Sequence, residues 1–276
     1  MNGGYEHPGP MTGGWGRLPR AVRALLVLTA SAFVLQGILE FFAGELVLET
    51  FGLSYRGIRH GFLWQPLTYL FMHGGFFHLL MNLLVLYFLG PETERFLGAR
   101  SFLGLYLVSG LLGGVGWLLM ENSPWATCIG ASGAVFGIIG AFAALFPDQP
   151  VTLLVFFVLP ITLRAWVLAV LLGLMELMFL LSPHQGGVAY AAHLAGGVAG
   201  YLYARMLLGR GRERGWGRSV RRWIQRSRPE KDSEAYRRQM DKLLDKIAAQ
   251  GIGSLTRRER EWLEHASRAR RESPGR

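Results

Sequence analysis

The sequence has few of the groups that stabilise or serve soluble proteins. Charged residues make up 17% of its 276 residues, whereas roughly a quarter is typical of soluble domains. Its single cysteine, Cys128, excludes an internal disulfide and the paired spacing of a zinc ribbon. Hydrophobic residues make up 51%, in several runs that approach or exceed the ~20 residues needed to cross a bilayer. The sequence therefore predicts an all-α polytopic membrane protein.

Six apolar runs are predicted to be membrane spans. The loop at 43–77, after the first of them, is aromatic and is expected to lie at the membrane interface, where Trp and Tyr are favoured. The apolar run 151–159 is interpreted as a re-entrant or interfacial piece. The six spans form one bundle over residues 21–208, at about 21–42, 78–96, 101–120, 131–146, 165–181 and 188–208.

The net charge of +10 comes from the end of the chain. From Gly209 onward lie 20 of the 29 Lys and Arg and 10 of the 19 Asp and Glu, so the remainder is neutral. Most arginines of the other loops fall on the side that also holds both termini. Because loops rich in Lys and Arg favour the cytoplasmic side, both termini are expected to be cytoplasmic, in a multi-pass protein of the cell (inner) membrane. The basic tail is interpreted as lying against anionic lipid, and no nucleic acid is expected.

Three segments lie outside the predicted bundle. The first is rich in Gly and Pro, and it precedes a first span that is expected to be retained rather than cleaved. In the last, apolar residues recur at helical spacing and Thr256 and Glu259 have the spacing of a capping box. The segments are a disordered N-terminus at 1–20, a basic linker at 209–232 and a small cytoplasmic helical hairpin at 233–272.

Four polar side chains lie at similar depth below the outer ends of the spans: His78, Asn82, Ser132 and His193. Polar groups inside a membrane are costly and are usually functional. Singly, the serine could serve helix packing and the histidine could be a hydrogen-bonded strut. Their common depth favours a joint chemical role.

A serine beside a histidine can act as a nucleophile, since the imidazole takes the hydroxyl proton and later returns it. Ser132 and His193 are therefore predicted to be catalytic. No Asp or Glu lies at matching depth in the sixth span, so we predict a Ser–His dyad. Packing is expected to hold the imidazole, with Phe136 as the candidate. Glu176, in the fifth span, is interpreted as a structural hydrogen-bond partner.

An oxyanion hole is predicted beside this dyad. His78 and Asn82 are four residues apart, hence on one helix face, and both offer N–H donors. The backbone N–H of Ser132 would be the third donor. His73 and His78 have a poor spacing for a shared metal and no carboxylate accompanies them, so no metal is predicted.

Glycines indicate where two spans meet. Gly133 and Gly137 have GxxxG spacing, as do Gly196 and Gly200. Small residues let helices approach closely in lipid. The fourth and sixth spans are therefore expected to touch, which would bring the serine and the histidine together.

Three motifs in this sequence resemble those of the rhomboid family of intramembrane serine proteases. They are His73-Gly74-Gly75-Phe76-Phe77-His78-Leu79-Leu80-Met81-Asn82, Gly130-Ala131-Ser132-Gly133, and Ala192-His193-Leu194-Ala195-Gly196 followed by Gly200. They are similar to the family's HxxxxHxxxN, GxSG and AHxxGxxxG patterns, and the resemblance covers about residues 21–210.

The resemblance implies a bacterial-type protein of six helices around a water-filled cavity that opens to the outer face. It implies cleavage of membrane proteins near that surface without a cofactor. Ser132 would be the nucleophile and His193 the base, while His78, Asn82 and the Ser132 amide would form the oxyanion hole. His73 would be a loop residue. A catalytically silent protein that binds client transmembrane helices is the alternative.

The sequence departs from the family pattern at three positions. Gln65 follows Trp64, where many members have arginine. Phe96 stands where an arginine ends the family's ExR motif. Phe136 stands where some members stack a tyrosine on the histidine, so the ring is kept without the hydroxyl.

Overall fold

The computed structural model describes residues 18–121, 123, 125–155, 158–182, 189–213, 234–256, 259–260 and 262–263. The chain divides into two compact units, Met1–Arg210 and Gly211–Arg276. Most of the predicted disordered N-terminus and of the basic linker lies outside the described residues, as does the end of the predicted hairpin.

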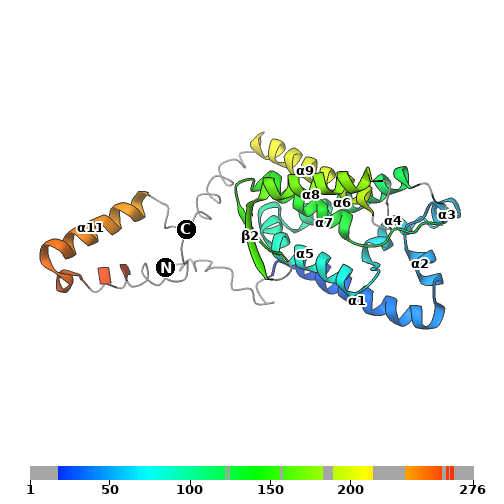
Figure 1. Ribbon diagram of the computed structural model, residues 1–276, viewed down its shortest axis with the longest axis horizontal. Coiled ribbons are helices and arrows are strands. Elements are labelled where there is room, and N and C mark those ends of the chain that lie inside the picture. Colours follow the sequence, from blue (N-terminus) through cyan, green and yellow to red (C-terminus); the bar gives the residue numbers. More distant parts are fainter. Residues whose placement is uncertain are drawn as a thin grey trace. The chain divides into compact units, whose positions relative to one another are not determined.

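The first unit is a bundle of helices (Figure 1). Each long helix begins and ends within two residues of a predicted span, except that α9 continues to Glu213. These helices are α1 (Arg20–Ala43), α5 (Phe76–Leu97), α6 (Ala99–Met120), α7 (Ser132–Leu145), α8 (Ala165–Leu180) and α9 (Tyr190–Glu213).

Apolar side chains cover the outside of this bundle. The helices α1, α5 and α6 are long and apolar enough to cross a membrane, and α7 and α8 are shorter apolar helices. Large exposed side chains include Phe41, Phe42, Leu119, Leu174 and Met178. In lipid such an exterior is favourable, and helices satisfy their own backbone hydrogen bonds there. The protein is therefore an all-α polytopic membrane bundle.

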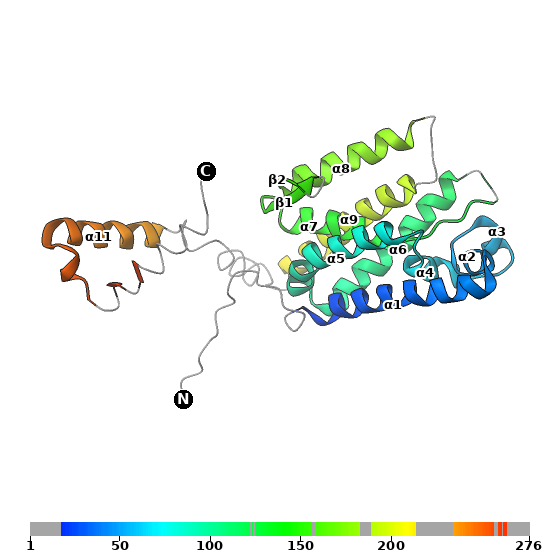
Figure 2. The same cartoon turned by 60° about the horizontal axis from the view of Figure 1, so that its bottom comes forward.

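Helix α7 is much more enclosed by the bundle than α8. Eleven of its 14 residues are buried, whereas α8 buries three of its 16. Figures 1 and 2 both show α1 and α8 on opposite sides of the bundle. Ser132 consequently begins a helix that its neighbours enclose along most of its length.

Glycines allow α6, α7 and α9 to meet backbone to backbone. A Cβ atom on Gly196 would collide with the carbonyl oxygen of Gly133, and one on Gly200 would collide with that of Gly137. A Cβ on Gly113 of α6 would lie 2.9 Å from the carbonyl oxygen of Ala192. The close approach that the GxxxG spacing predicted is present, and it leaves no room for a side chain.

A methyl group added at this contact should destabilise the bundle. Gly200→Ala should force α7 and α9 apart, at a cost of about 1–3 kcal/mol for overpacking, and should lower the thermal unfolding temperature in detergent. The matched control is Gly173→Ala on α8, where a Cβ would meet nothing within 4 Å. Equal unfolding temperatures for the two variants would contradict the argument.

The start of α1 is held by a buried carboxylate from α5. Glu94 is 4% exposed, and its two oxygens accept from the N–H groups of Ala21 at 3.0 Å and Val22 at 2.7 Å. Those amides belong to the first turn, which lacks helix acceptors, and the helix dipole favours a negative charge there. Glu94 therefore anchors α1 although Phe96 departs from the family motif.

The loop between α1 and α5 is folded. It contains three short helices and one 3-10 turn: α2 (Leu46–Phe51), α3 (Tyr55–Arg59), α4 (Gln65–Thr68) and η2 (Tyr69–Phe71). The fully buried Gln65 ties it together, because its Oε1 accepts from Ser54 N–H at 3.1 Å and its Nε2 donates to the Glu49 carbonyl at 2.7 Å. The glutamine thus anchors the loop where many members have arginine.

The segment predicted to be re-entrant or interfacial is a β-hairpin. Strands β1 (Pro150–Val155) and β2 (Leu159–Arg164) pair antiparallel, and Thr152 faces Thr162 with their hydroxyl oxygens 2.9 Å apart. Threonine and valine favour strands because they are β-branched. In Figures 1 and 2 the hairpin lies at the opposite end of the bundle from α2, α3 and α4.

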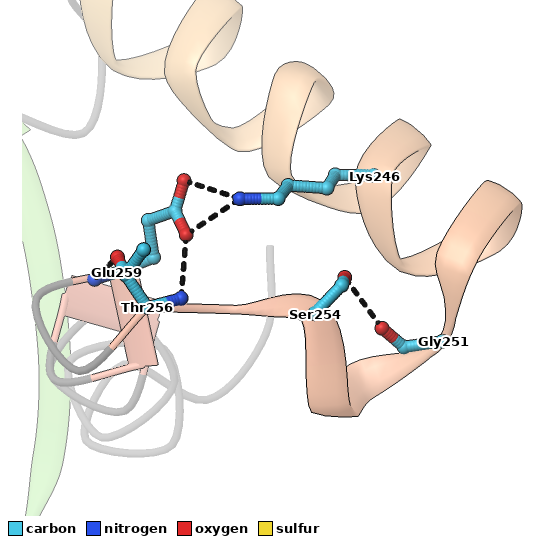
Figure 3. A network of polar contacts seen from close by, with 5 residues as sticks. All are labelled: Lys246, Gly251, Ser254, Thr256 and Glu259. Atoms are coloured by element: carbon cyan, nitrogen blue, oxygen red, sulfur yellow. Dashed lines mark hydrogen bonds and ion pairs between the residues drawn. The ribbon is translucent and has the colours of Figure 1, made fainter.

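The second unit contains α11 (Glu234–Gln250) and η4 (Ile252–Ser254). Lys246 of α11 donates to both carboxylate oxygens of Glu259, at 3.0 and 2.9 Å (Figure 3). Glu259 also accepts from Thr256 N–H at 2.7 Å, and its own N–H donates to the threonine hydroxyl at 3.3 Å, which is the reciprocal geometry of a capping box. The lysine and the threonine lower the pKa of Glu259 to about 2.

Loss of the lysine should loosen the segment after α11. In Lys246→Ala, amide hydrogen exchange at residues 252–260 should become faster, because the carboxylate loses its partner on the helix. Lys242→Ala removes an exposed lysine of the same helix and should leave the exchange unchanged. Equal exchange in both variants would show that the contact does not order this segment.

Candidate active site

Ser132 is the first residue of α7 and follows a constrained glycine. Gly130 has φ +124°, and a Cβ there would lie 2.7 Å from Nε2 of His78. The Gly130 N–H donates to the carbonyl oxygen of Tyr69 at 2.9 Å. A first-turn amide such as that of Ser132 has no acceptor within its own helix. The backbone before the serine is thus fixed in a shape that brings the His78 ring close.

His193 lies on α9, 61 residues further along the chain, and its Nε2 is 2.8 Å from Oγ of Ser132. This separation fits a hydrogen bond in which the hydroxyl donates to an unprotonated ring nitrogen. The glycine contact between α7 and α9 is adjacent in the chain, since Gly133 follows Ser132 and Gly196 lies three residues after His193. The predicted pair therefore lies within hydrogen-bond distance.

Phe136, one turn after Ser132, stacks on the His193 ring. The ring centroids are 4.5 Å apart and the planes differ by 4°. The expected packing on the imidazole is present, and it limits rotation of the ring about an axis in its plane.

A carboxylate reaches the second nitrogen of the same ring. Oε2 of Glu176, on α8, is 2.9 Å from Nδ1 of His193, with the two side chains 7% and 13% exposed. The prediction that packing alone holds the imidazole is therefore wrong. That prediction considered acids within the sixth span only, whereas this one comes from the neighbouring fifth span.

His78 and Asn82 lie one turn apart on α5. The Gly74 N–H donates to Nδ1 of His78 at 3.4 Å, so the ring proton of a neutral His78 is on Nε2, the nitrogen that faces Gly130. One N–H of the Asn82 amide donates to the His78 carbonyl at 3.0 Å, which leaves its second N–H available. Both predicted donors thus keep a proton to offer.

His73 supports this region from the loop. It is 1% exposed, and its ring lies 5.1 Å from that of His78, centroid to centroid. The backbone N–H of His73 donates to Gln36 Oε1 and its backbone carbonyl accepts from Gln36 Nε2, each at 2.9 Å. Because Gln36 belongs to α1, this helix holds the loop in place. Burial, and then the neighbouring His78, lower the pKa of His73 to about 4.

The lowered pKa of His73 makes stability depend on pH. In the unfolded chain His73 has its usual pKa of 6.5 and becomes protonated below that pH, whereas in the folded chain it becomes protonated only near pH 4. Between these two values the unfolded chain binds more protons, so acidification favours unfolding. We expect the unfolding temperature to fall less between pH 7 and 5 in His73→Gln than in the unsubstituted protein. An identical fall would contradict the burial argument.

The structure brings together all the predicted site residues and adds three. Tyr69 joins the loop to the site, since its hydroxyl donates to the Gly110 carbonyl at 2.5 Å while its own carbonyl holds Gly130. Gln36 and Glu176 are the other two. For Gln36 and Glu176 the sequence signal was a polar residue within an apolar run, which did not identify the partner. Tyr69, in the loop, had no such signal.

The bundle and this cluster define a class: a polytopic helical membrane protein that presents a serine, a histidine and nearby N–H donors at one end of its helices. The sequence matches the Rhomboid domain family over residues 60–210, and the chain belongs to the rhomboid family. Residues 230–269 match a family of unknown function, DUF6576.

Relatives come from distant organisms. The chain is 37% identical over 137 residues to Rhomboid protein 1, mitochondrial, of Saccharomyces cerevisiae, covering 48% of this chain and 38% of that protein. It is 38% identical over 101 residues to Rhomboid-like protease 3 of Toxoplasma gondii (36% and 38%). It is 36% identical over 118 residues to Rhomboid protease GluP of Bacillus subtilis (40% and 23%). The chain thus spans less than half the length of each.

Proposed function

We propose that this protein is a serine endopeptidase that cleaves transmembrane segments of other membrane proteins. The observation that carries the proposal is the 2.8 Å separation of Ser132 Oγ and His193 Nε2 within an apolar bundle. Family membership and relatives named as rhomboid proteases support it.

In the first step the Ser132 hydroxyl passes its proton to Nε2 of His193 as Oγ attacks the carbonyl carbon of the scissile peptide bond. The product of this attack is a tetrahedral intermediate with a negative oxygen. The imidazolium then gives the proton to the departing amine nitrogen, the C–N bond breaks, and an acyl-enzyme ester remains.

Three N–H donors surround the place where negative charge develops. They are Nε2 of His78, the free amide N–H of Asn82, and the backbone N–H of Ser132 at the positive end of the α7 dipole. Donors of this kind are worth most where little water competes with them, typically about 10²–10³-fold in kcat for one such donor.

Water completes the reaction. Its oxygen attacks the ester carbon while His193 takes one of its protons, and the collapse of the second tetrahedral intermediate returns that proton to Oγ of Ser132. The products are a new carboxylate and free enzyme, and no cofactor takes part in this reaction.

In the proposed orientation the protein lies in the cell (inner) membrane with both termini in the cytoplasm. The site then opens to the outer face of that membrane. The basic tail and the loop arginines support it through the positive-inside rule. Substrate helices must unwind locally to expose the scissile bond. Segments with Gly or Ser near the cut are favoured, because both residues form helices less readily than Ala or Leu and so lower that cost.

Ser132→Ala should abolish cleavage of a fluorescent transmembrane substrate in liposomes, with a fall of about 10³-fold or more in kcat. Ser109→Ala provides a control, since Ser109 is another serine of the bundle, fully buried on α6, and this variant should retain cleavage. Unchanged cleavage by Ser132→Ala would overturn the assignment. Binding of the substrate helix by the unsubstituted protein without cleavage would instead support the silent alternative.

A further inference from the structure

Glu176 is a carboxylate at an unusual place. It is 5% exposed on α8, a helix whose other side chains between Ala165 and Leu180 are all apolar. A polar group in such a setting is costly unless it is hydrogen-bonded. Its Oε2 is hydrogen-bonded to Nδ1 of His193, at 2.9 Å. The partner of this buried acid is therefore the proposed catalytic base.

The two ring nitrogens of His193 point to different helices. Nε2 faces Ser132 on α7 and Nδ1 faces Glu176 on α8, at 2.8 and 2.9 Å. Only a histidine with its proton on Nδ1 leaves Nε2 free to accept the serine proton. An ionised carboxylate can only accept, so contact with it selects this tautomer.

We propose that Glu176 is a positioning residue that completes a Ser132–His193–Glu176 triad inside the membrane bundle. This inference rests on the proposed function and adds a member to its machinery. Glu176 accepts the Nδ1–H, fixes the ring together with the stacked Phe136, and stabilises the imidazolium that forms when Ser132 gives up its proton. In this role Glu176 exchanges no proton with the substrate.

The charges near the imidazole act in opposite directions. Glu176 from α8 favours the protonated ring, whereas His78 from α5, on the other side of Gly130, disfavours it when it is itself charged. Ser132 from α7 is neutral before it reacts, and Phe136 is apolar. Removal of the Glu176 charge should therefore make the imidazolium lose its proton at lower pH.

The decisive variant is Glu176→Gln, which keeps the shape and removes the charge. We expect kcat at neutral pH to fall by about 10²-fold or more. The acid limb of kcat against pH should also move to lower pH. Glu94→Gln provides the matched control, because Glu94 is the bundle's other deeply buried carboxylate among the described residues and holds α1 rather than His193. It should lower the unfolding temperature and leave the pH profile in place.

A second measurement does not depend on proteolysis. In the intact protein labelled with ¹⁵N at histidine rings, the spectrum should show His193 with its proton on Nδ1, and Glu176→Gln should change that signal while Glu94→Gln should not. The signal of His193 is assigned as the one that disappears in the His193→Ala variant. An unprotonated Nδ1 in the unsubstituted protein would overturn the inference, as would an unshifted acid limb in Glu176→Gln. Absence of any cleavage with the expected His193 spectrum would instead count against the proposed function alone.

Discussion

The contact between the backbones of α7 and α9 is the constraint on which the site depends. Ser132 and His193 are far apart in sequence and come from different helices, and their 2.8 Å separation requires the helix axes to approach more closely than ordinary side chains allow. Gly133, Gly196 and Gly200 supply that approach. In lipid, where burial of apolar surface drives helices together only weakly, such close packing is a main source of association.

Around this contact, polar side chains hold the parts that helices alone cannot position. Gln65 ties the first loop to itself, Gln36 ties the loop to α1, and Glu94 ties α1 to α5. Tyr69 then connects the loop to the turn before Ser132. Gln65, Gln36 and Glu94 use side-chain groups to satisfy backbone amides or carbonyls that lie outside regular helical bonding, whereas the bond from Gly130 to Tyr69 joins two backbone groups. Such partners are why buried polar residues persist in so apolar a protein.

Much of this arrangement could be predicted from the sequence because it follows periodic or local rules. Apolar runs of span length gave the helix bounds, and GxxxG spacing indicated which helices meet. The role of Glu176 could not be found in this way, since an acid that acts across two helices has no spacing signature. The strand character of 150–164 was missed for a different reason: a short apolar run is compatible with a membrane piece, and its β-branched residues are decisive only once a paired strand is known. The anchoring role of Gln65 could not be predicted either, because it depends on backbone groups of residues 49 and 54 that only the folded loop brings within its reach.

The glycine contact also has an entropic consequence. Where side chains interdigitate, assembly of two helices restricts their rotamers, which costs up to about 2 kcal/mol for a long side chain. The facing surfaces at Gly133, Gly137, Gly196 and Gly200 have no rotamers to restrict, so α7 and α9 can associate without that loss. The distance between the backbones that carry Ser132 and His193 is thus set by main-chain packing, and only the two reacting side chains and their neighbours remain to be oriented.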